Sequence, residues 1–234
     1  MRPLAEHVIL ITGATDGLGK AVAMQLARTG ATLLLHGRDE ARGQRMLEEI
    51  RAQTGNTHLQ WYRADFSQFA QVRALAERLV REQERLDVLV NNAGIGTTLP
   101  GGGARQESED GYELRFAVNY LAPFLLTRLL LPTLRQSAPA RIVNVSSAGQ
   151  APINFLDVML EQNYDGVQAY CQSKLALVMF TFDLAEELAG TGVTANCLHP
   201  ATYMPTKMVL AERREQRQHH RGGSADHHAP DHGA

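Results

Sequence analysis

The sequence contains little cysteine and little net charge. Only Cys171 and Cys197 occur among 234 residues, which is too few for a framework of disulfides. Basic residues number 23 and acidic residues 25, so the formal net charge of −2 leaves no broad basic surface for nucleic acid or for an anionic membrane. The expected partners are therefore small molecules, with no nucleic acid and no membrane among them.

Long apolar runs and the features of a secretory leader are also lacking. The first residues, MRPLAEHVILITGAT, have neither the apolar length nor the cleavage site of a signal peptide. The longest apolar run, around FLLTRLLL, is broken by Thr127 and Arg128 and ends at Pro132, short of the roughly 20 residues of a membrane helix. We therefore expect a soluble protein in the reducing cytoplasm.

Large hydrophobic residues are absent from residues 211–234, where no Val, Ile, Leu, Met, Phe, Trp, Tyr or Cys occurs. Because such a segment has almost nothing to bury, we predict a single domain at 1–210 followed by a disordered His-rich tail at 211–234. Its histidines invite a metal-site interpretation, but no thiol accompanies them and we predict no metal site. They are His219, His220, His227, His228 and His232.

Short apolar runs alternate with amphipathic stretches over the rest of the chain. The runs lie at 8–12, 32–37, 59–64, 87–94, 141–147 and 193–200, with helical patterns at 17–29, 39–53, 68–84, 109–136 and 166–190. Within 68–84 the expected core face consists of residues at helical spacing, namely Phe69, Val72, Leu75, Leu79 and Val80. Strands that are apolar on both faces and separated by helices predict an α/β fold with a doubly wound parallel sheet, the Rossmann fold.

Three glycines lie in ITGATDGLGK (11–20), between the first expected strand and the first expected helix. A Gly-rich turn at this position lets the backbone approach a pyrophosphate at a helix N-terminus, although glycines alone are equally compatible with a flexible turn. The spacing of Thr12, Gly13, Gly17 and Gly19 differs from the usual dinucleotide fingerprint. Asp16 is an unexpected acid beside an anion, so we expect its side chain to point away or to bond to amides of the turn.

Three motifs in order resemble the classical short-chain dehydrogenase/reductase family: TGATDGLG, NNAG at 91–94 and YCQSK at 170–174. The resemblance covers roughly residues 6–207, and the segment 153–180 is most similar to the branch of retinol dehydrogenases and carbonyl reductases. It implies a cofactor-binding turn of Gly13, Thr15, Asp16, Gly17, Leu18 and Gly19, with Asp65 and Phe66 beside the adenine and Asn92, Ala93 and Gly94 near its ribose. It also implies that Tyr170 and Lys174 contact the cofactor, with Lys174 on the nicotinamide ribose.

The end of the second expected strand favours NADP over NAD. An acid at this point accepts from the ribose 2′-hydroxyl of NAD, whereas LLLHGRDE places Gly37 there, followed by Arg38. A guanidinium can bind a 2′-phosphate through two parallel hydrogen bonds, so NADP is the predicted cofactor. The alternative is that Arg38 only opens a solvated helix start, with Asp39 as its N-cap.

Tyr170 and Lys174 lie four residues apart on an expected helix and therefore share one face. Reducing a carbonyl requires an acid, and the ordinary tyrosine pKa of about 10 is poorly matched to neutral pH. Lowering this pKa by about three requires about 4 kcal/mol, which an ammonium at roughly 4.5 Å supplies at an effective dielectric of about 20. We predict that Tyr170 is the catalytic acid and that Lys174 assists it.

Two further catalytic residues follow from the resemblance. In the family a serine at the end of the fifth strand binds the substrate oxygen. Strand alternation lets only one of Ser146 and Ser147 face the site, and because the family usually uses the second serine of such a pair, we predict Ser147. Asn119 in FAVNYLAPF matches the family asparagine that positions a water in a proton relay from the lysine. The alternative for Asn119 is that its amide only bonds neighbouring backbone.

The chain departs from the family near its C-terminus. Pro200 is followed by Ala201 in place of glycine, with Thr202 and Thr206 as candidates for a nicotinamide contact, and the usual seventh strand and closing helices give way to the His-rich tail. We therefore expect a truncated or altered C-terminus, a sheet without its usual last strand, a more open substrate pocket and a weakened homo-oligomer.

The predicted function is an NADP-dependent oxidoreductase that transfers a hydride between the nicotinamide and a carbonyl or a primary or secondary alcohol. Apolar residues ahead of Tyr170 point to a lipophilic substrate, namely Leu156, Val158, Met159 and Leu160. The alternative is a protein that binds NADP without turnover, because the catalytic residues are present while substrate elements are missing.

Overall fold

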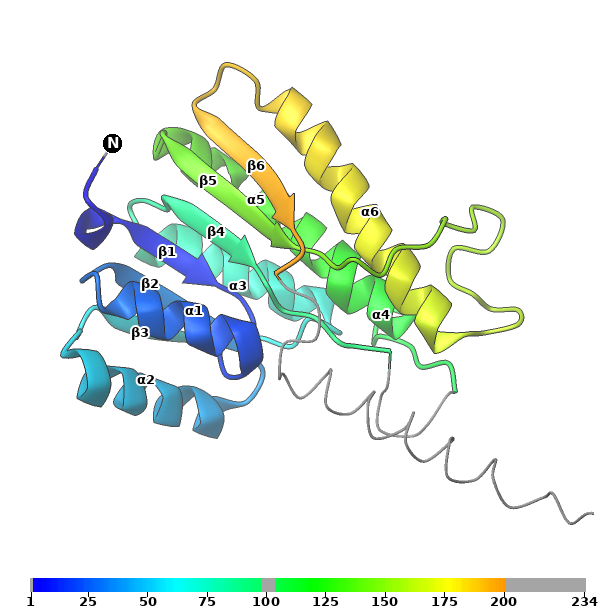
Figure 1. Ribbon diagram of the computed structural model, residues 1–234, viewed down its shortest axis with the longest axis horizontal. Coiled ribbons are helices and arrows are strands. Elements are labelled where there is room, and N and C mark those ends of the chain that lie inside the picture. The colour runs from blue at the N-terminus through cyan, green and yellow to red at the C-terminus, as the bar shows by residue number, and fades with distance from the viewer. Residues whose placement is uncertain (1, 98–103, 201–234) are drawn as a thin grey trace, which may run out of the picture.

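A computed structural model describes residues 2–97 and 104–200 (Figure 1). Its centre is a six-stranded parallel sheet in the order β3-β2-β1-β4-β5-β6. The strands are β1 (Val8–Ile11), β2 (Thr32–Gly37), β3 (Leu59–Arg63), β4 (Val88–Asn91), β5 (Ala140–Val145) and β6 (Val193–Leu198). The order reverses between β1 and β4, and ligands of such sheets bind at the carboxyl edge of this switch point. The predicted doubly wound fold is confirmed.

Helices connect the strands and cover both faces of the sheet. On one face lie α1 (Gly17–Ala27) and α2 (Glu40–Thr54), and on the other lie α3 (Phe69–Glu82), α5 (Ala122–Gln136) and α6 (Gly166–Glu187) (Figure 1). A short helix α4 (Leu114–Phe116) and a π-helical turn η2 (Ala117–Leu121) lead directly into α5, and a 3-10 turn η1 (Leu4–Glu6) precedes β1.

The helical segment before β5 begins at Leu114, later than the predicted start at 109. Glu113 caps it, because its side chain accepts a hydrogen bond from Phe116 N at 2.7 Å. Glu107 and Glu113 pair in an isolated antiparallel bridge, which closes the residues between them into a turn. Because the polar stretch between Glu107 and Glu113 pairs its own backbone groups in this turn, it does not extend the helix.

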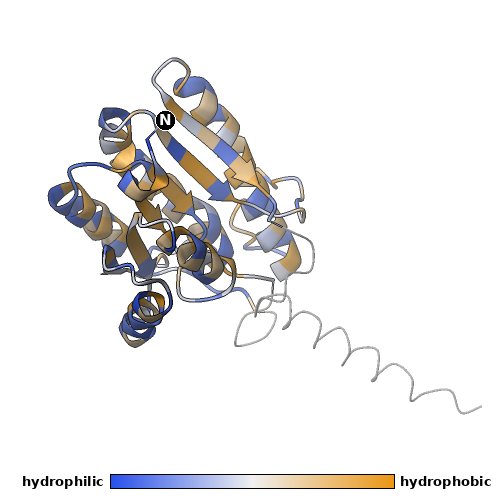
Figure 2. Cartoon of the chain, turned by 60° about the vertical axis from the view of Figure 1, so that its left-hand side comes forward, coloured by the Kyte–Doolittle hydropathy of each residue, from blue (hydrophilic) through white to orange (hydrophobic). Residues whose placement is uncertain are grey.

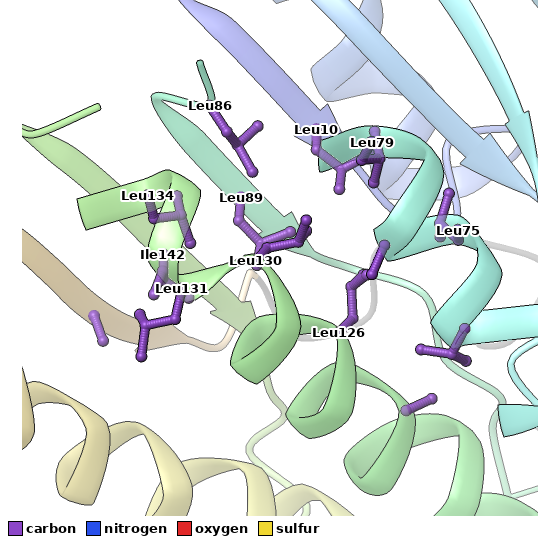
Figure 3. Close-up of a cluster of buried hydrophobic side chains, with 14 of the residues drawn as sticks. Leu10, Leu75, Leu79, Leu86, Leu89, Leu126, Leu130, Leu131, Leu134 and Ile142 are labelled. Atoms are coloured by element: carbon purple, nitrogen blue, oxygen red, sulfur yellow. The ribbon is translucent and has the colours of Figure 1, made fainter. Parts of the chain in front are cut away.

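Two hydrophobic layers fill the space between the sheet and its helices. Figure 3 shows the larger one, in which Leu10, Leu89 and Ile142 of the sheet meet Leu126 and Leu130 of α5, each at most 1% exposed. In Figure 2 the hydrophobic colouring is concentrated in the strands, and the helices carry both colours. Both layers leave the carboxyl ends of the strands free for polar residues.

The predicted core face of α3 is correct except at Val80. Val72, Leu75 and Leu79 are buried, whereas Val80 is 50% exposed. Consecutive residues of a helix point about 100° apart, so the burial of Leu79 turns Val80 towards solvent.

The segment Leu114–Gln136 is long and apolar enough, by length and composition alone, to cross a membrane. The sequence predicted no apolar segment of this length, because only uninterrupted apolar runs were counted. Most of it is buried inside the protein, where α5 packs against α3 and the sheet. Its place in the core accounts for its apolar composition.

β6 forms one edge of the sheet within the described part of the chain. Thr202, Thr206 and the predicted His-rich tail at 211–234 lie outside the described residues. The domain boundary at 210 and the nicotinamide contacts of the two threonines therefore stay predictions.

Candidate active site

The glycine turn joins the carboxyl end of β1 to α1 at the switch point of the sheet. Gly13 and Gly17 have φ of 65° and 50°, a left-handed conformation that favours glycine. A Cβ on Gly19 would lie 2.3 Å from the Gly13 carbonyl oxygen and 2.5 Å from Asn92 Nδ2, so a side chain is excluded there. Bare backbone thus meets the N-terminus of α1, a position suited to a pyrophosphate.

Asp16 caps α1 and turns its charge towards a cation. Its Oδ1 accepts a hydrogen bond from Gly17 N at 2.8 Å, and its Oδ2 lies 3.7 Å from Arg42 Nη2. We expected the Asp16 side chain either to point away from the turn or to bond to its amides, and the structure shows the bond to an amide. The ion pair with Arg42 offsets part of the negative charge beside the expected anion.

The glycine turn is tied to the residues that follow β4. Buried Thr12 accepts from Asn92 N at 2.9 Å and from Ala93 N at 3.0 Å through its Oγ1. Asn92 Nδ2 donates in return to the carbonyls of Thr12 at 2.9 Å and Gly13 at 3.1 Å. The amide of Asn92 therefore holds the turn, and Thr12 has a positioning role that its place in the motif alone did not predict.

His36, at the end of β2, supports the same turn and was not predicted to do so. Its Nδ1 accepts from Gly13 N at 3.4 Å, and its Nε2–H faces the Ala64 carbonyl at 3.1 Å, which fixes the tautomer. Its ring stacks on Phe66, with centroids 4.4 Å apart. Burial lowers the pKa of His36 to about 4, so the imidazole is neutral at physiological pH.

Asp65 and Phe66, both expected beside the adenine, have different surroundings. Phe66 is buried against His36, whereas Asp65 is half-buried and its carboxylate accepts from Ser67 N at 2.9 Å and Ser67 Oγ at 2.8 Å. Phe66 therefore acts first as a packing residue under the turn. Contact of either residue with an adenine stays a prediction.

The neutral state of His36 predicts how stability depends on pH. The unfolded chain takes up a proton near pH 6.5, whereas folded His36 does so only near pH 4, so the His36 contribution is present above pH 6.5 and is lost as the pH falls towards 4. The linkage is worth about 3 kcal/mol. Urea unfolding at pH 7, 5.5 and 4.5 is expected to show a smaller loss in His36→Gln than in wild type. The exposed control His58→Gln should follow wild type, and parallel curves for His36→Gln and wild type would contradict the assignment.

Two arginines lie at the carboxyl ends of β2 and β3. A Cβ on Gly37 would lie 2.7 Å from Trp61 Cη2, so an acidic side chain cannot replace this glycine without moving the indole. Arg38 is exposed, and Arg63 Nε donates to the Arg38 carbonyl at 3.3 Å from the neighbouring strand. Arg63 was not predicted, because only the pairing of β2 with β3 brings it beside Arg38. Asp39 caps α2 by accepting from Arg42 N at 3.0 Å, as the alternative expected, so contact of Arg38 with a 2′-phosphate stays a prediction.

Tyr170 and Lys174 share one face of α6, as their spacing predicts. Lys174 Nζ lies 5.9 Å from the centre of the Tyr170 ring and donates to the Val145 carbonyl at 3.0 Å. Burial lowers the pKa of Lys174 to about 8, so the ammonium form still predominates at neutral pH. Asp165 begins the helix by accepting from Val167 N at 2.7 Å. The Lys174 ammonium therefore lies beside the Tyr170 phenol, which is the predicted acid.

Ser146 and Ser147 have different surroundings. Ser146 is buried and its Oγ donates to the Lys174 carbonyl at 3.0 Å. Ser147 is half-buried and accepts from Gly149 N at 3.1 Å. A Cβ on Gly149 would lie 3.5 Å from Ser147 Oγ and 3.7 Å from Tyr170 Cε1, so Ser147 and Tyr170 flank the same glycine. This placement favours Ser147 as the serine that faces a substrate.

Asn119 is fully buried in the π-helical turn η2. Its Oδ1 accepts from Ile95 N at 2.8 Å, and its Nδ2 donates to the Ile95 carbonyl at 3.0 Å and to Ser173 Oγ at 3.1 Å. A Cβ on Gly94 would lie 3.2 Å from Asn119 Oδ1 and 3.4 Å from Lys174 Nζ, which places all three residues together. The amide thus bonds the Ile95 backbone, as the alternative expected of nearby backbone, and also the Ser173 side chain; the water-positioning role stays a prediction.

A sequence model of the family described as short chain dehydrogenase matches residues 7–217. The chain belongs to this family. Curated relatives of this short-chain dehydrogenase include human retinol dehydrogenase 13, which is 41% identical over 82% of this chain and 57% of the relative. Human retinol dehydrogenase 12 is 43% identical over 84% of this chain and 61% of the relative. The chain therefore spans less than two thirds of the length of these relatives.

Solved structures with similar folds include complexes with NADP. The RhlG/NADP active-site complex of Pseudomonas aeruginosa is 30% identical, with a TM-score of 0.71 over 93% of this chain and 81% of that chain. A metagenomic short-chain oxidoreductase in complex with NADP is 28% identical, with a TM-score of 0.71 over 92% of both chains. These likenesses agree with the fold described above.

Proposed function

We propose that this short-chain dehydrogenase is an NADP-dependent oxidoreductase that interconverts a carbonyl and a primary or secondary alcohol. The observation that carries the proposal is the meeting of Tyr170, Lys174 and Ser147 within one site, beside a glycine turn whose bare backbone suits a phosphate. The NADP complexes among its structural relatives and the retinol dehydrogenases among its curated relatives support the same reading.

The residues present fit an NADP cofactor, which when bound supplies or accepts the hydride. The bare backbone of Gly13 and Gly19 would hold the pyrophosphate, and Arg38, with Arg63 beside it, would hold the 2′-phosphate. Gly37 supports this preference, because the Trp61 ring occupies the space in which an acidic side chain would discriminate against that phosphate.

The chain's own side chains provide the proton chemistry. During reduction the Tyr170 O–H gives its proton to the substrate oxygen, and the Ser147 O–H donates a hydrogen bond to the same oxygen. The Lys174 ammonium stabilises the phenolate that remains on Tyr170. In alcohol oxidation the same groups act in reverse, with Tyr170 as the base.

A lipophilic carbonyl compound is the proposed substrate class. The loop before α6 exposes Phe155 at 75% and Leu156 at 100%, whereas Leu160 is buried. The loop therefore does not form one apolar wall, but its exposed apolar side chains precede the helix that carries Tyr170 and offer contact to an apolar substrate.

The test is NADPH consumption with a panel of aliphatic, aromatic and polyene aldehydes and ketones, together with NADPH binding measured by fluorescence. We expect binding and turnover, with the more apolar carbonyls preferred. Binding without oxidation of NADPH across the panel would instead select the alternative, a cofactor-binding protein without turnover.

Arg38 is expected to determine cofactor preference. Loss of a charge-assisted bond to the 2′-phosphate in Arg38→Gln should raise KM for NADPH about 10- to 100-fold and leave KM for NADH unchanged. Arg63→Gln should act in the same direction with a smaller effect. Arg51→Gln, an exposed change in the last turn of α2, is the matched control. Equal changes for both cofactors in Arg38→Gln would show that Arg38 does not read the phosphate.

A further inference from the structure

A buried ion pair lies beside the active site and has no part in the chemistry described above. Arg115 and Glu113 are 1% and 0% exposed, and Arg115 Nη1 lies 3.5 Å from Glu113 Oε1. Arg115 Nε donates to the Gly96 carbonyl at 2.9 Å, and Nη2 donates to the Thr97 carbonyl. One guanidinium thus holds two consecutive carbonyls of the segment that follows NNAG.

Tyr164 joins this ion pair to the start of α6. Its O–H donates to Glu113 Oε1 at 3.0 Å, and its oxygen accepts from Arg115 Nη1. Burial, with the Glu113 charge, raises the pKa of Tyr164 to about 12, so this residue stays a hydroxyl and keeps both bonds. A Cβ on Gly166, the first residue of α6, would lie 3.0 Å from Arg115 Nη2, which shows how closely the helix start approaches the guanidinium.

The cluster therefore bridges the two walls of the proposed site. One wall is the segment after β4, which continues from Asn92, Ala93 and Gly94; the other is α6, which carries Tyr170 six residues after Tyr164. A buried ion pair adds little net stability compared with apolar packing, but its fork geometry permits few arrangements of the partners. Rigid placement is the property such a cluster adds.

We propose that Glu113, Arg115 and Tyr164 form a positioning cluster that sets the placement of Tyr170 relative to the cofactor-binding segment after β4. The proposal rests on the proposed function, since it concerns the same site. None of the three residues is assigned contact with the reacting atoms, so they act through Tyr170 and the backbone of residues 95–97. A misplacement of about 1 Å can cost about 100-fold in rate, which gives such a cluster a measurable effect.

The test is Tyr164→Phe, which keeps the ring and removes both bonds of the hydroxyl. In single-turnover reduction with protein in excess over NADPH, we expect the rate constant of NADPH oxidation to fall about 10-fold while its amplitude stays unchanged. Affinity for 2′,5′-ADP, which reports the distant adenosine end of the cofactor site, should equal that of wild type. A merely structural role would lower the amplitude and leave the rate constant unchanged.

Two further variants complete the experiment. Arg115→Lys keeps the charge but loses the fork and should lower the rate constant more than Tyr164→Phe does. Tyr112→Phe is the matched control, because the ring of Tyr112 stacks on Phe69, and its rate constant should equal that of wild type. Wild-type turnover with an unchanged rate constant in Tyr164→Phe would overturn the cluster and leave the proposed function standing. If the wild-type chain failed to oxidise NADPH with any carbonyl of the panel, the proposed function would be overturned, and the cluster with it.

Discussion

Tyr170→Phe is expected to lose nearly all carbonyl reduction while it still binds NADPH. The substitution removes only the hydroxyl that protonates the substrate oxygen, and general acid catalysis contributes about 10²- to 10⁴-fold to such reactions. The ring that packs over Lys174 stays in place, so the fold and the cofactor turn are unaffected. The measurements are kcat on a carbonyl that wild type reduces and the dissociation constant of NADPH.

A matched control for Tyr170→Phe is available on the turn η2. Tyr120 is half-buried in an aromatic group with Phe116, Phe124 and Phe180, and its hydroxyl has no part in the proposed chemistry. Tyr120→Phe should therefore keep wild-type kcat. If Tyr170→Phe kept kcat within about threefold of wild type, Tyr170 could not be the acid, since general acid catalysis accounts for at least about 100-fold.

The parts of the fold that follow local patterns could be predicted from the sequence. The core face of α3 follows from helical spacing, and the glycine turn from its place between a strand and a helix. The pairing of Tyr170 with Lys174 needs only a spacing of four positions on one helix. Each of these features lies within a short stretch of chain, so it can be recognised in the sequence without knowledge of the fold.

Residues whose partners are distant in the chain could not be predicted in this way. His36 bonds to Gly13 and Ala64, 23 and 28 residues away, and Arg115 bonds to Tyr164, 49 residues away. A single histidine in a strand has no periodicity, and an arginine near a helix start resembles a surface cation. Asn119 shows the intermediate case, because resemblance identifies the residue while only the structure shows that its amide binds Ile95.

Gly19→Ala is expected to weaken NADPH binding about 10- to 100-fold and to destabilise the fold by about 1–3 kcal/mol. In an ordinary helix the same substitution is stabilising by about 1 kcal/mol, because alanine has the higher helix propensity. Here the new Cβ would lie 2.3 Å from the Gly13 carbonyl oxygen, so the backbone of the cofactor turn must move. Isothermal titration with NADPH and urea unfolding measure the two effects.

The two effects of Gly19→Ala can be separated with a second glycine. Gly192 has φ of 79° and lies at the amino end of β6, the opposite edge of the sheet from the site, with Ala138 Cβ 3.2 Å from its own Cβ position. Gly192→Ala should destabilise the fold by a similar amount and leave the NADPH dissociation constant unchanged. Equal NADPH affinities in wild type and Gly19→Ala would mean that the turn can shift without loss of the phosphate contact, and the turn would then not be the phosphate site. Weaker binding in Gly19→Ala alone would link the loss to the geometry of the turn, since Gly192→Ala is also strained, through its positive φ, but lies away from the turn.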